Sequence, residues 1–312
     1  MVVVVSRAQA GARLDRFLAG ALGVSRSELQ RWIEAGRVTV GGVARDASSR
    51  VREGESVEVE PMAPASSDAV PEAGVVFEVL HVDDAVVVVN KPPGLVVHPA
   101  RGHEGGTLVN GLLARGFFAA GEGDHERPGI VHRLDKGTSG VMVVARTPEA
   151  REALKAQFQA HSIERAYVAI VAGEVRVTEH ATLHGRHPRD RMRFTTKVRT
   201  GKRAVTHVRV LEKGEGVTLV ECTLETGRTH QIRVHLAESG TPVLGDPLYG
   251  RPPRDPALRA AAERLGHQAL HARVLGFVHP ATGKPVRFEV SPPPDFLALW
   301  SALRPAGPGA GA

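Results

Sequence analysis

The sequence contains a single cysteine, Cys222, among its 312 residues. One thiol excludes an internal disulfide and any zinc site built from several cysteines, and it suits a reducing compartment. We therefore expect a cytoplasmic protein.

Long apolar runs are also missing. No stretch of roughly 18 consecutive apolar residues occurs, so the sequence predicts no membrane-spanning helix and no membrane partner. Residues 1–6 are apolar but lack a basic n-region, and we interpret them as a β-strand. The formal charge of +6 favours a polyanionic partner, while a hydrophobic content of 42% allows a buried core.

The first 61 residues form a small unit in our interpretation. Residues 12–37 carry two helical patterns, in which Ser25 and Glu28 form a capping box and Gly36 provides a left-handed C-terminus. Residues 38–42 and 55–60 have the alternation of strands. Residues 62–74 are rich in Ala, Ser and Pro and predict a linker.

Residues 75–303 predict a larger α+β domain with a largely antiparallel sheet. Short β-rich runs alternate with polar turns, at residues 86–89, 141–145, 167–171, 217–220 and 288–290. Helical patterns cover residues 148–161 and 256–265. Residues 304–312 consist mainly of Gly, Ala and Pro and predict a disordered tail.

The most informative segment runs from Gly129 to Ala145. A polar loop containing Asp135 precedes an apolar strand, which is a common place for catalytic groups. An isolated Asp in such a loop is usually a turn-former. Here Arg133 and Lys136 flank it and the loop has no second acid, so the acid pair of a typical glycosidase is not evident.

This loop, His132-Arg-Leu-Asp-Lys-Gly-Thr-Ser-Gly140, resembles the catalytic motif of the RluA/RluD family of pseudouridine synthases. Further stretches resemble the family in its order, at residues 90–99, 164–169, 227–235, 245–250, 270–280 and 291–296. The helix pair near the N-terminus is similar to an S4 RNA-binding domain. The chain departs from the family at His81-Val-Asp-Asp84, where a Tyr-Glu-Asp stretch is common, and at Gly41, where S4 domains often have Asn.

The resemblance implies isomerisation of uridine to pseudouridine in a structured RNA, most of all a stem-loop of large-subunit (23S) ribosomal RNA. The reaction leaves atoms and oxidation state unchanged and needs no cofactor. By the same resemblance Asp135 is the catalytic carboxylate, Arg228 holds it by hydrogen bonds, and Tyr167 stacks on the uracil. As an isolated residue Arg228 could instead bind a phosphate, and whether Asp135 attacks the sugar, adds to the base or takes a ribose proton stays open.

Further residues are candidates for binding the RNA. In the catalytic domain they are Arg133, which would fill the space left by the flipped nucleotide, His132, Lys91 and His98. Lys91 and His98 could equally support the fold. In the S4-like unit they are Arg13, Arg16, Arg26 and Arg31. Residues 186–209 have many cations and one acid, Asp190, and we interpret them as a loop that grips RNA.

Several alternatives stay open or are excluded. One alternative is a noncatalytic S4-type RNA-binding protein, which would have the same basic surfaces. Another is a pseudouridine synthase that acts on tRNA. A metal hydrolase is disfavoured, because the 15 histidines include no HExxH pattern. A nucleotide-binding enzyme is disfavoured as well, because neither a Walker A loop nor a GxGxxG motif after a strand is present. We expect a monomer without metal.

Overall fold

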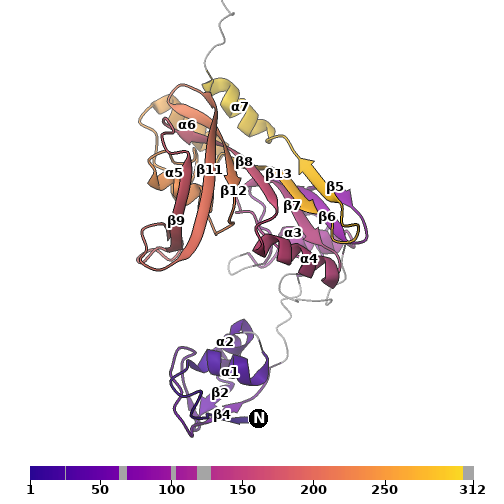
Figure 1. The fold of residues 1–312 in the computed structure, drawn as a ribbon, viewed down its shortest axis with the longest axis vertical. Coiled ribbons are helices and arrows are strands. Elements are labelled where there is room, and N and C mark those ends of the chain that lie inside the picture. The colour runs from indigo at the N-terminus through magenta and orange to yellow at the C-terminus, as the bar shows by residue number, and fades with distance from the viewer. Residues whose placement is uncertain (25, 63–68, 100–102, 118–127, 305–312) are drawn as a thin grey trace, which may run out of the picture. The chain divides into compact units, whose positions relative to one another are not determined.

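The computed structural model describes residues 1–24, 26–62, 69–99, 103–117 and 128–304. The chain divides into two compact units, Met1–Ser66 and Ser67–Ala312 (Figure 1). Within the described segments, no helix is long and apolar enough to cross a membrane.

The first unit contains the two predicted helices, α1 (Leu14–Leu22) and α2 (Arg26–Glu34). Their apolar stripes, which include Leu14, Leu18 and Leu29, are buried in one core. Gly36 follows α2 with φ +71°, as its predicted left-handed role requires. Ser25 of the predicted capping box lies outside the described residues.

A four-stranded antiparallel sheet completes this core. Its order is β1-β4-β2-β3. The strands are β1 (Val2–Val4), β2 (Val38–Val40), β3 (Val43–Ala44) and β4 (Ser56–Val59). In β4, Val57 and Val59 are buried and Glu58 is exposed, which is the alternation that predicted the strand.

The second unit is built on a ten-stranded sheet whose main order is β10-β9-β11-β12-β8-β13-β7-β6-β5, with β14 pairing to β13. The strands are β5 (Glu78–Val82), β6 (Val86–Lys91), β7 (Ser139–Ala145), β8 (Glu164–Ala172), β9 (Glu179–Arg186), β10 (Phe194–Thr195), β11 (Lys202–Lys213), β12 (Val217–Leu224), β13 (Leu270–Val278) and β14 (Pro285–Glu289). Of these pairs, β13 with β7 is parallel and the rest are antiparallel. The predicted α+β class with a largely antiparallel sheet is confirmed.

Five helices accompany this sheet in the described residues: α3 (Leu108–Ala114), α4 (Pro148–Gln159), α5 (Gln231–Glu238), α6 (Pro256–Leu265) and α7 (Pro294–Leu303). The two predicted from sequence, α4 and α6, have complete N-terminal signals. Thr147 caps α4 by accepting the Ala150 N–H, Asp255 caps α6 by accepting the Leu258 N–H, and each cap precedes a proline.

Part of the predicted linker 62–74 packs on the second unit. Ala69 is buried, the Asn110 side chain donates to the Val70 carbonyl at 2.8 Å, and Glu72 accepts the Gly106 N–H. Residues 63–68 and 305–312 lie outside the described residues. The boundaries 1–61 and 75–303 stay predictions.

Two parts of the large core meet near the middle of the sheet. One part joins β8 and β12 to α5, α6 and α7, and another joins β6 and β7 to α3. Tyr167 on β8 packs against both. Figure 1 shows β8, β13 and β7 crossing the middle of the unit between these two groups of helices. The predicted site residues Tyr167, on β8, and Asp135, in the loop before β7, lie beside these central strands.

Candidate active site

Asp135 lies in the loop that leads into β7. The loop is anchored on both sides of the carboxylate, because Leu134 and Thr138 are buried. Thr138 donates its N–H to the Asp135 carbonyl at 3.0 Å and accepts a hydrogen bond from the Gln268 side chain at 3.0 Å. The polar loop before a buried apolar strand thus presents one carboxylate from a rigid support.

Arg233 on α5 holds this carboxylate. Its Nη1 donates to Asp135 Oδ2 at 2.8 Å, while its Nε and Nη2 donate to the two oxygens of Asp246 at 2.7 and 2.8 Å. Asp246 also accepts the N–H groups of Leu248 and Tyr249. A guanidinium that is held in a bidentate pair on one edge can present its remaining N–H in one direction.

The charges of this group support one another. Burial by itself lowers the pKa of Arg233, but the hydrogen bonds and attraction from Asp246 and Asp135 outweigh it and raise that pKa. Burial raises the pKa of Asp246, and the Arg233 guanidinium with two backbone N–H groups brings it below its ordinary value. Arg233 and Asp246 are therefore both charged at neutral pH.

The predicted pairing of Arg228 with Asp135 is corrected by this geometry. Arg228 precedes the first turn of α5, its Nε donates to the Arg203 carbonyl at 3.2 Å, and its N–H donates to the Gln231 side chain. Arg233, five residues later, lies on the helix and reaches Asp135. Both arginines were in the recognised motif, so the signal for Arg233 was present in the sequence.

Tyr167 lies on β8 at the same cavity as Asp135. Its ring is half-buried, and burial raises the pKa of its hydroxyl to about 12, with Arg165 opposing and Asp135 assisting the rise. The phenol is therefore neutral at neutral pH. A neutral aromatic ring beside a carboxylate can stack on a planar base.

A cavity of about 550 Å³ joins these groups. Its lining includes Asp135, Tyr167, Arg233, Arg228, His132 and Arg133. Pockets of this size hold small ligands. The lining combines apolar side chains with one carboxylate, Asp135, and several cations, which suits a ligand that carries negative charge. The structure thus brings five predicted site residues to one cavity and adds Arg233.

The remaining predicted residues of this unit differ in position. His132 faces the cavity but stacks on Phe158 and accepts the Val143 N–H at Nε2, and burial lowers its pKa to about 3. Arg133 is exposed at the cavity. His98 is buried and does not line the cavity.

Of the two roles expected for Lys91, a substrate contact or support of the fold, its surroundings favour support. It is fully buried, and its ammonium donates to the carbonyls of Pro92, Leu95 and Lys136. Burial lowers its pKa to about 7, although Asp135 opposes the shift. Lys91 therefore ties the segment after β6 to the loop that contains Asp135.

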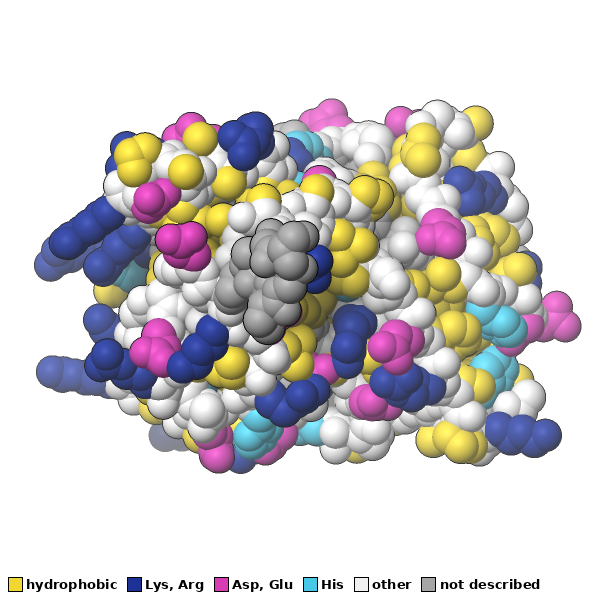
Figure 2. All heavy atoms as spheres, turned by 90° about the horizontal axis from the view of Figure 1, so that it is seen from above, with side chains coloured by type: hydrophobic (Ala, Val, Ile, Leu, Met, Phe, Trp, Pro, Cys, Tyr) yellow, Lys and Arg dark blue, Asp and Glu magenta, His cyan; other side chains and the backbone are white. Residues whose placement is uncertain are grey.

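The predicted basic loop 186–209 is corrected as well, because much of it is strand. It contains the last residue of β9, all of β10 and the first eight of the twelve residues of β11. Exposed cations of this segment are Arg186, Arg189, Arg191, Lys197, Arg199, Lys202, Arg203 and Arg209, of which the last two pair with Glu225 and Glu221. Figure 2 shows Lys and Arg side chains at the left edge of the face that it draws, the side where Figure 1 draws β9 and β11.

In the first unit the predicted arginines are placed on or beside the helices. Arg13 makes two hydrogen bonds of 3.0 Å to Asp15, and Arg16 is exposed on α1. Arg31 is half-buried on α2, and the side chain of Arg26 lies outside the described residues. Asp15 neutralises part of the charge near Arg13.

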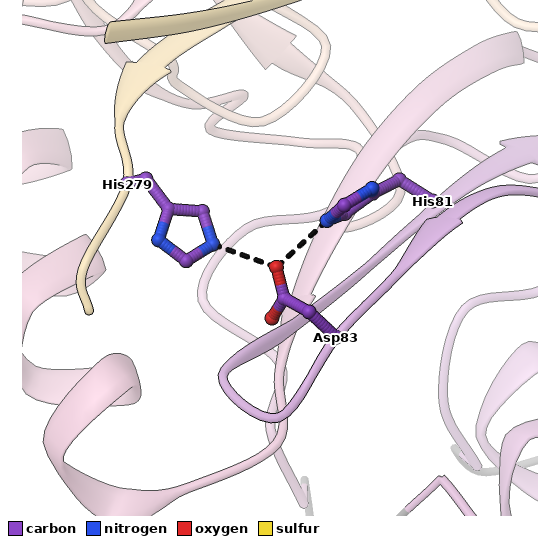
Figure 3. Close-up of side chains that lie close together, drawn as sticks. All are labelled: His81, Asp83 and His279. Atoms are coloured by element: carbon purple, nitrogen blue, oxygen red, sulfur yellow. Dashed lines mark hydrogen bonds and ion pairs between the residues drawn. The ribbon is translucent and has the colours of Figure 1, made fainter. Parts of the chain in front are cut away.

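One cluster in the described residues has the composition of a metal site: His81, Asp83 and His279 (Figure 3). Both Nε2 atoms lie at Asp83 Oδ2, at 2.7 and 2.9 Å. Nδ1 of His279 accepts the N–H groups of Ala281 and Thr282 at 3.3 and 3.2 Å, so its proton is on Nε2. A metal would have to displace that proton and break this arrangement, and we interpret the cluster as a hydrogen-bonded link between β5 and the turn after β13.

The family models and the curated proteins that this chain matches agree on one family of enzymes. Residues 85–238 match the sequence model of the family described as RNA pseudouridylate synthase, and residues 12–57 match the S4 domain. The chain is 44% identical over 309 residues to ribosomal large subunit pseudouridine synthase D of Xanthomonas campestris pv. campestris, covering 96% of this chain and 92% of that protein. It is 43% identical over 309 residues to the uncharacterized RNA pseudouridine synthase YlyB of Bacillus subtilis, covering 98% of each.

Among solved structures, human RNA pseudouridylate synthase domain containing 1 has a TM-score of 0.55 and 26% sequence identity, covering 76% of this chain and 90% of that chain. Human RNA pseudouridylate synthase domain containing 4 has a TM-score of 0.54 at 26% identity, covering 72% and 92%.

Proposed function

This chain belongs to the RNA pseudouridylate synthase family, and we propose that it isomerises uridines in a stem-loop of large-subunit ribosomal RNA, with Asp135 as the catalytic carboxylate. The proposed substrate is supported by the relative from Xanthomonas campestris, whose name includes the ribosomal large subunit and which matches nearly the whole chain. The S4 match at residues 12–57 supports an RNA substrate.

The observation that carries the catalytic proposal is the position of the Asp135 carboxylate. Arg233 holds Oδ2, and the residue lines the cavity beside Tyr167. Breaking the N1–C1′ bond of uridine develops positive charge at C1′, which a carboxylate stabilises by its charge or by direct attack. The uracil then turns and C5 bonds to C1′. The C5 proton is lost and N1, freed from the sugar, takes up a proton, so atoms and oxidation state are unchanged and no cofactor is consumed.

Tyr167 and Arg133 have separate tasks in this proposal. The neutral ring of Tyr167 stacks on the uracil while it is detached from the sugar. Arg133, exposed at the mouth of the cavity, takes the place of the nucleotide that leaves its stack. Flipping costs a few kcal/mol and least in loops, which favours a stem-loop substrate.

Affinity comes from cationic surfaces away from the carboxylate. The exposed cations of residues 186–209 contact phosphates, and Arg13, Arg16, Arg26 and Arg31 add contacts from the S4-like unit. His132 lines the site and His98 supports it from inside the fold. Arg228, whose guanidinium donates to the Arg203 carbonyl, also faces a phosphate or sugar of the bound nucleotide.

The test is a map of pseudouridine in all cellular RNAs with and without this protein, followed by restoration with the purified enzyme on the corresponding transcript. Loss of one or more sites in large-subunit ribosomal RNA is expected. Loss confined to tRNA would replace the proposed substrate. Unchanged pseudouridine in all RNAs, with retained RNA binding, would favour a noncatalytic RNA-binding protein.

We also propose that the enzyme works in the cytoplasm as a monomer. A buried, solitary Cys222 is compatible with a reducing compartment, and the proposed reaction uses groups of one chain. Light scattering during size-exclusion chromatography measures the molar mass, for which 33.2 kDa is expected.

A further inference from the structure

His230 has an unusual backbone for its place in the active site. Its φ is +58°, and the other described non-glycine residue with positive φ is His161, at +56°. Both line the cavity. A left-handed backbone is unfavourable for residues with a Cβ and persists where neighbouring contacts hold it, often at functional sites.

Tyr249 determines which nitrogen of His230 carries the proton. The Phe194 N–H donates to the Tyr249 hydroxyl at 2.8 Å, and the hydroxyl lies 2.9 Å from Nδ1 of His230. Among the described residues the hydroxyl has no other acceptor within reach, and we assign its proton to the bond with Nδ1. Burial lowers the pKa of His230 despite the opposing attraction of Asp135, and a neutral ring that accepts at Nδ1 has its proton on Nε2.

That N–H points toward the free oxygen of the catalytic carboxylate. Nε2 lies 3.8 Å from Oδ1 of Asp135, whereas Arg233 holds Oδ2. In the described part of the chain no side chain or backbone N–H donates to Oδ1. A separation of 3.8 Å exceeds a hydrogen bond, but catalytic contacts often shorten when the substrate closes the site.

Other charges around His230 do not compete for this contact. Arg233 and Asp246 are paired with each other, and Arg133 is exposed at the cavity. The ring is also held edge-on by Phe194 and Tyr249, with interplanar angles of 81° and 75°. Ring orientation, proton position and backbone therefore all direct Nε2 to Asp135.

We propose, on the premise of the function given above, that His230 is a positioning residue whose Nε2–H, set by Tyr249, orients Oδ1 of Asp135 toward the ribose. Arg233 already holds one oxygen of the carboxylate, and when the substrate closes the site the His230 contact shortens and holds the other, so the carboxylate cannot rotate while uracil leaves. The relay begins at Phe194 on β10, which belongs to the basic segment. RNA bound to that segment therefore affects the orientation of Asp135 through the hydrogen bonds of Phe194, Tyr249 and His230.

The test compares three variants of the full chain by single-turnover tritium release from C5-labelled uridine RNA. His230→Asn tolerates the left-handed backbone but is too short to place an N–H at the Nε2 position, and its rate is expected to fall about a hundredfold. His230→Gln reaches that position and is expected to stay within about tenfold of the parent. Tyr249→Phe, which removes only the hydroxyl, is expected to lose about tenfold. RNA affinity should not change in any of them.

His81→Asn is the matched control, because its ring contacts Asp83 on the edge of the sheet and not the cavity. It should keep the parental rate. Thermal melting identifies the variants that fold. If His230→Asn does not fold, the inference is tested by the rates of His230→Gln and Tyr249→Phe alone.

Parental rates in folded His230→Asn and Tyr249→Phe overturn the inference while leaving the proposed function intact, as does a loss that Gln does not rescue. A loss of RNA affinity with an unchanged rate at saturating enzyme also overturns it. A parent enzyme that forms no pseudouridine refutes the proposed function itself, and the role of His230 with it.

Discussion

Arg233 and Arg228 line the same cavity, but they have different hydrogen-bond partners and therefore different proposed roles. Arg233 is buried between two carboxylates, and Arg228 donates to a backbone carbonyl near the surface. Lysine retains the charge of Arg233 but cannot donate to Asp135 and bind both oxygens of Asp246 at once. We expect Arg233→Lys to lower the single-turnover rate about a hundredfold at saturating enzyme.

Arg228→Lys is the matched control, and it should stay within about tenfold of the parental rate while weakening RNA binding. Thermal melting accompanies both variants, because a misplaced charge between buried carboxylates also lowers the stability of the fold. A larger loss of rate in Arg228→Lys than in Arg233→Lys would reverse the assignment.

The sequence was sufficient to predict Asp135 and Tyr167 at one cavity, but not the partner of the carboxylate. The choice between Arg228 and Arg233 depends on where α5 begins, and the helix begins at Gln231 after the left-handed His230. No propensity predicts a left-handed histidine. Lys91 was ambiguous for a similar reason, because its three acceptors are backbone carbonyls, which leave no pattern in a sequence.

The contact between β9 and α5 contains a cluster of buried histidines. His235 lies between the hydroxyls of Thr182 and Thr206, each at 2.9 Å, and stacks on His180. Burial, with the neighbouring His180 and His184, lowers the pKa of His235 to about 4, below the ordinary value of about 6.5. Between pH ~6.5 and about 4, His235 therefore binds more protons in the unfolded chain than in the folded one.

The contribution of His235 to stability is complete above pH ~6.5 and is lost as the pH falls toward its folded value. We expect the denaturant midpoint to decrease from pH 7 to pH 5, and to decrease less in His235→Gln, which cannot be charged. Equal pH dependence in the two proteins would show that the proton uptake lies elsewhere.

Elements with strong local signals could be predicted, and elements that depend on tertiary context could not. The sequence predicts α4 and α6 by their N-caps and prolines, and it predicts β6 and β7 by their runs of valine. Helix α5 was missed because it is buried on nearly all sides, with Gln231, Arg233 and His235 inside, so it has no polar face to give a helical period. Strand β11 was obscured by its exposed cations.

At the scale of the whole molecule, the two units divide affinity from chemistry in this account. All of the proposed catalytic residues lie after residue 75, whereas residues 1–61 carry the arginines of the S4-like unit. Deleting residues 1–61 should weaken RNA binding and slow modification at low enzyme, but leave turnover at saturating enzyme. The slope of affinity against salt should also decrease, because fewer phosphates are neutralised.

Filter binding at several salt concentrations measures both slopes. Identical slopes for the full chain and the truncated chain would show that the S4-like unit is not on the RNA.

The reaction as proposed requires no metal. Turnover should survive chelation, provided that the RNA is shown to keep its fold without magnesium. Tritium release from C5-labelled RNA in chelator measures this, and lost turnover on a correctly folded substrate would contradict it. The His81, Asp83 and His279 cluster offers a control, since Asp83→Asn should change thermal stability and not rate.

The central claim is that the negative charge of Asp135 performs the chemistry. Asp135→Asn keeps the size of the side chain and leaves the cationic surfaces unchanged, so RNA affinity should persist. Thermal melting is needed in parallel, because Arg233 keeps only Asp246 as its partner. The measurement is pseudouridine formation in a single turnover with saturating enzyme, and the account predicts that folded Asp135→Asn forms none. A folded variant within about tenfold of the parental rate, a difference of only ~1.4 kcal/mol, would contradict it.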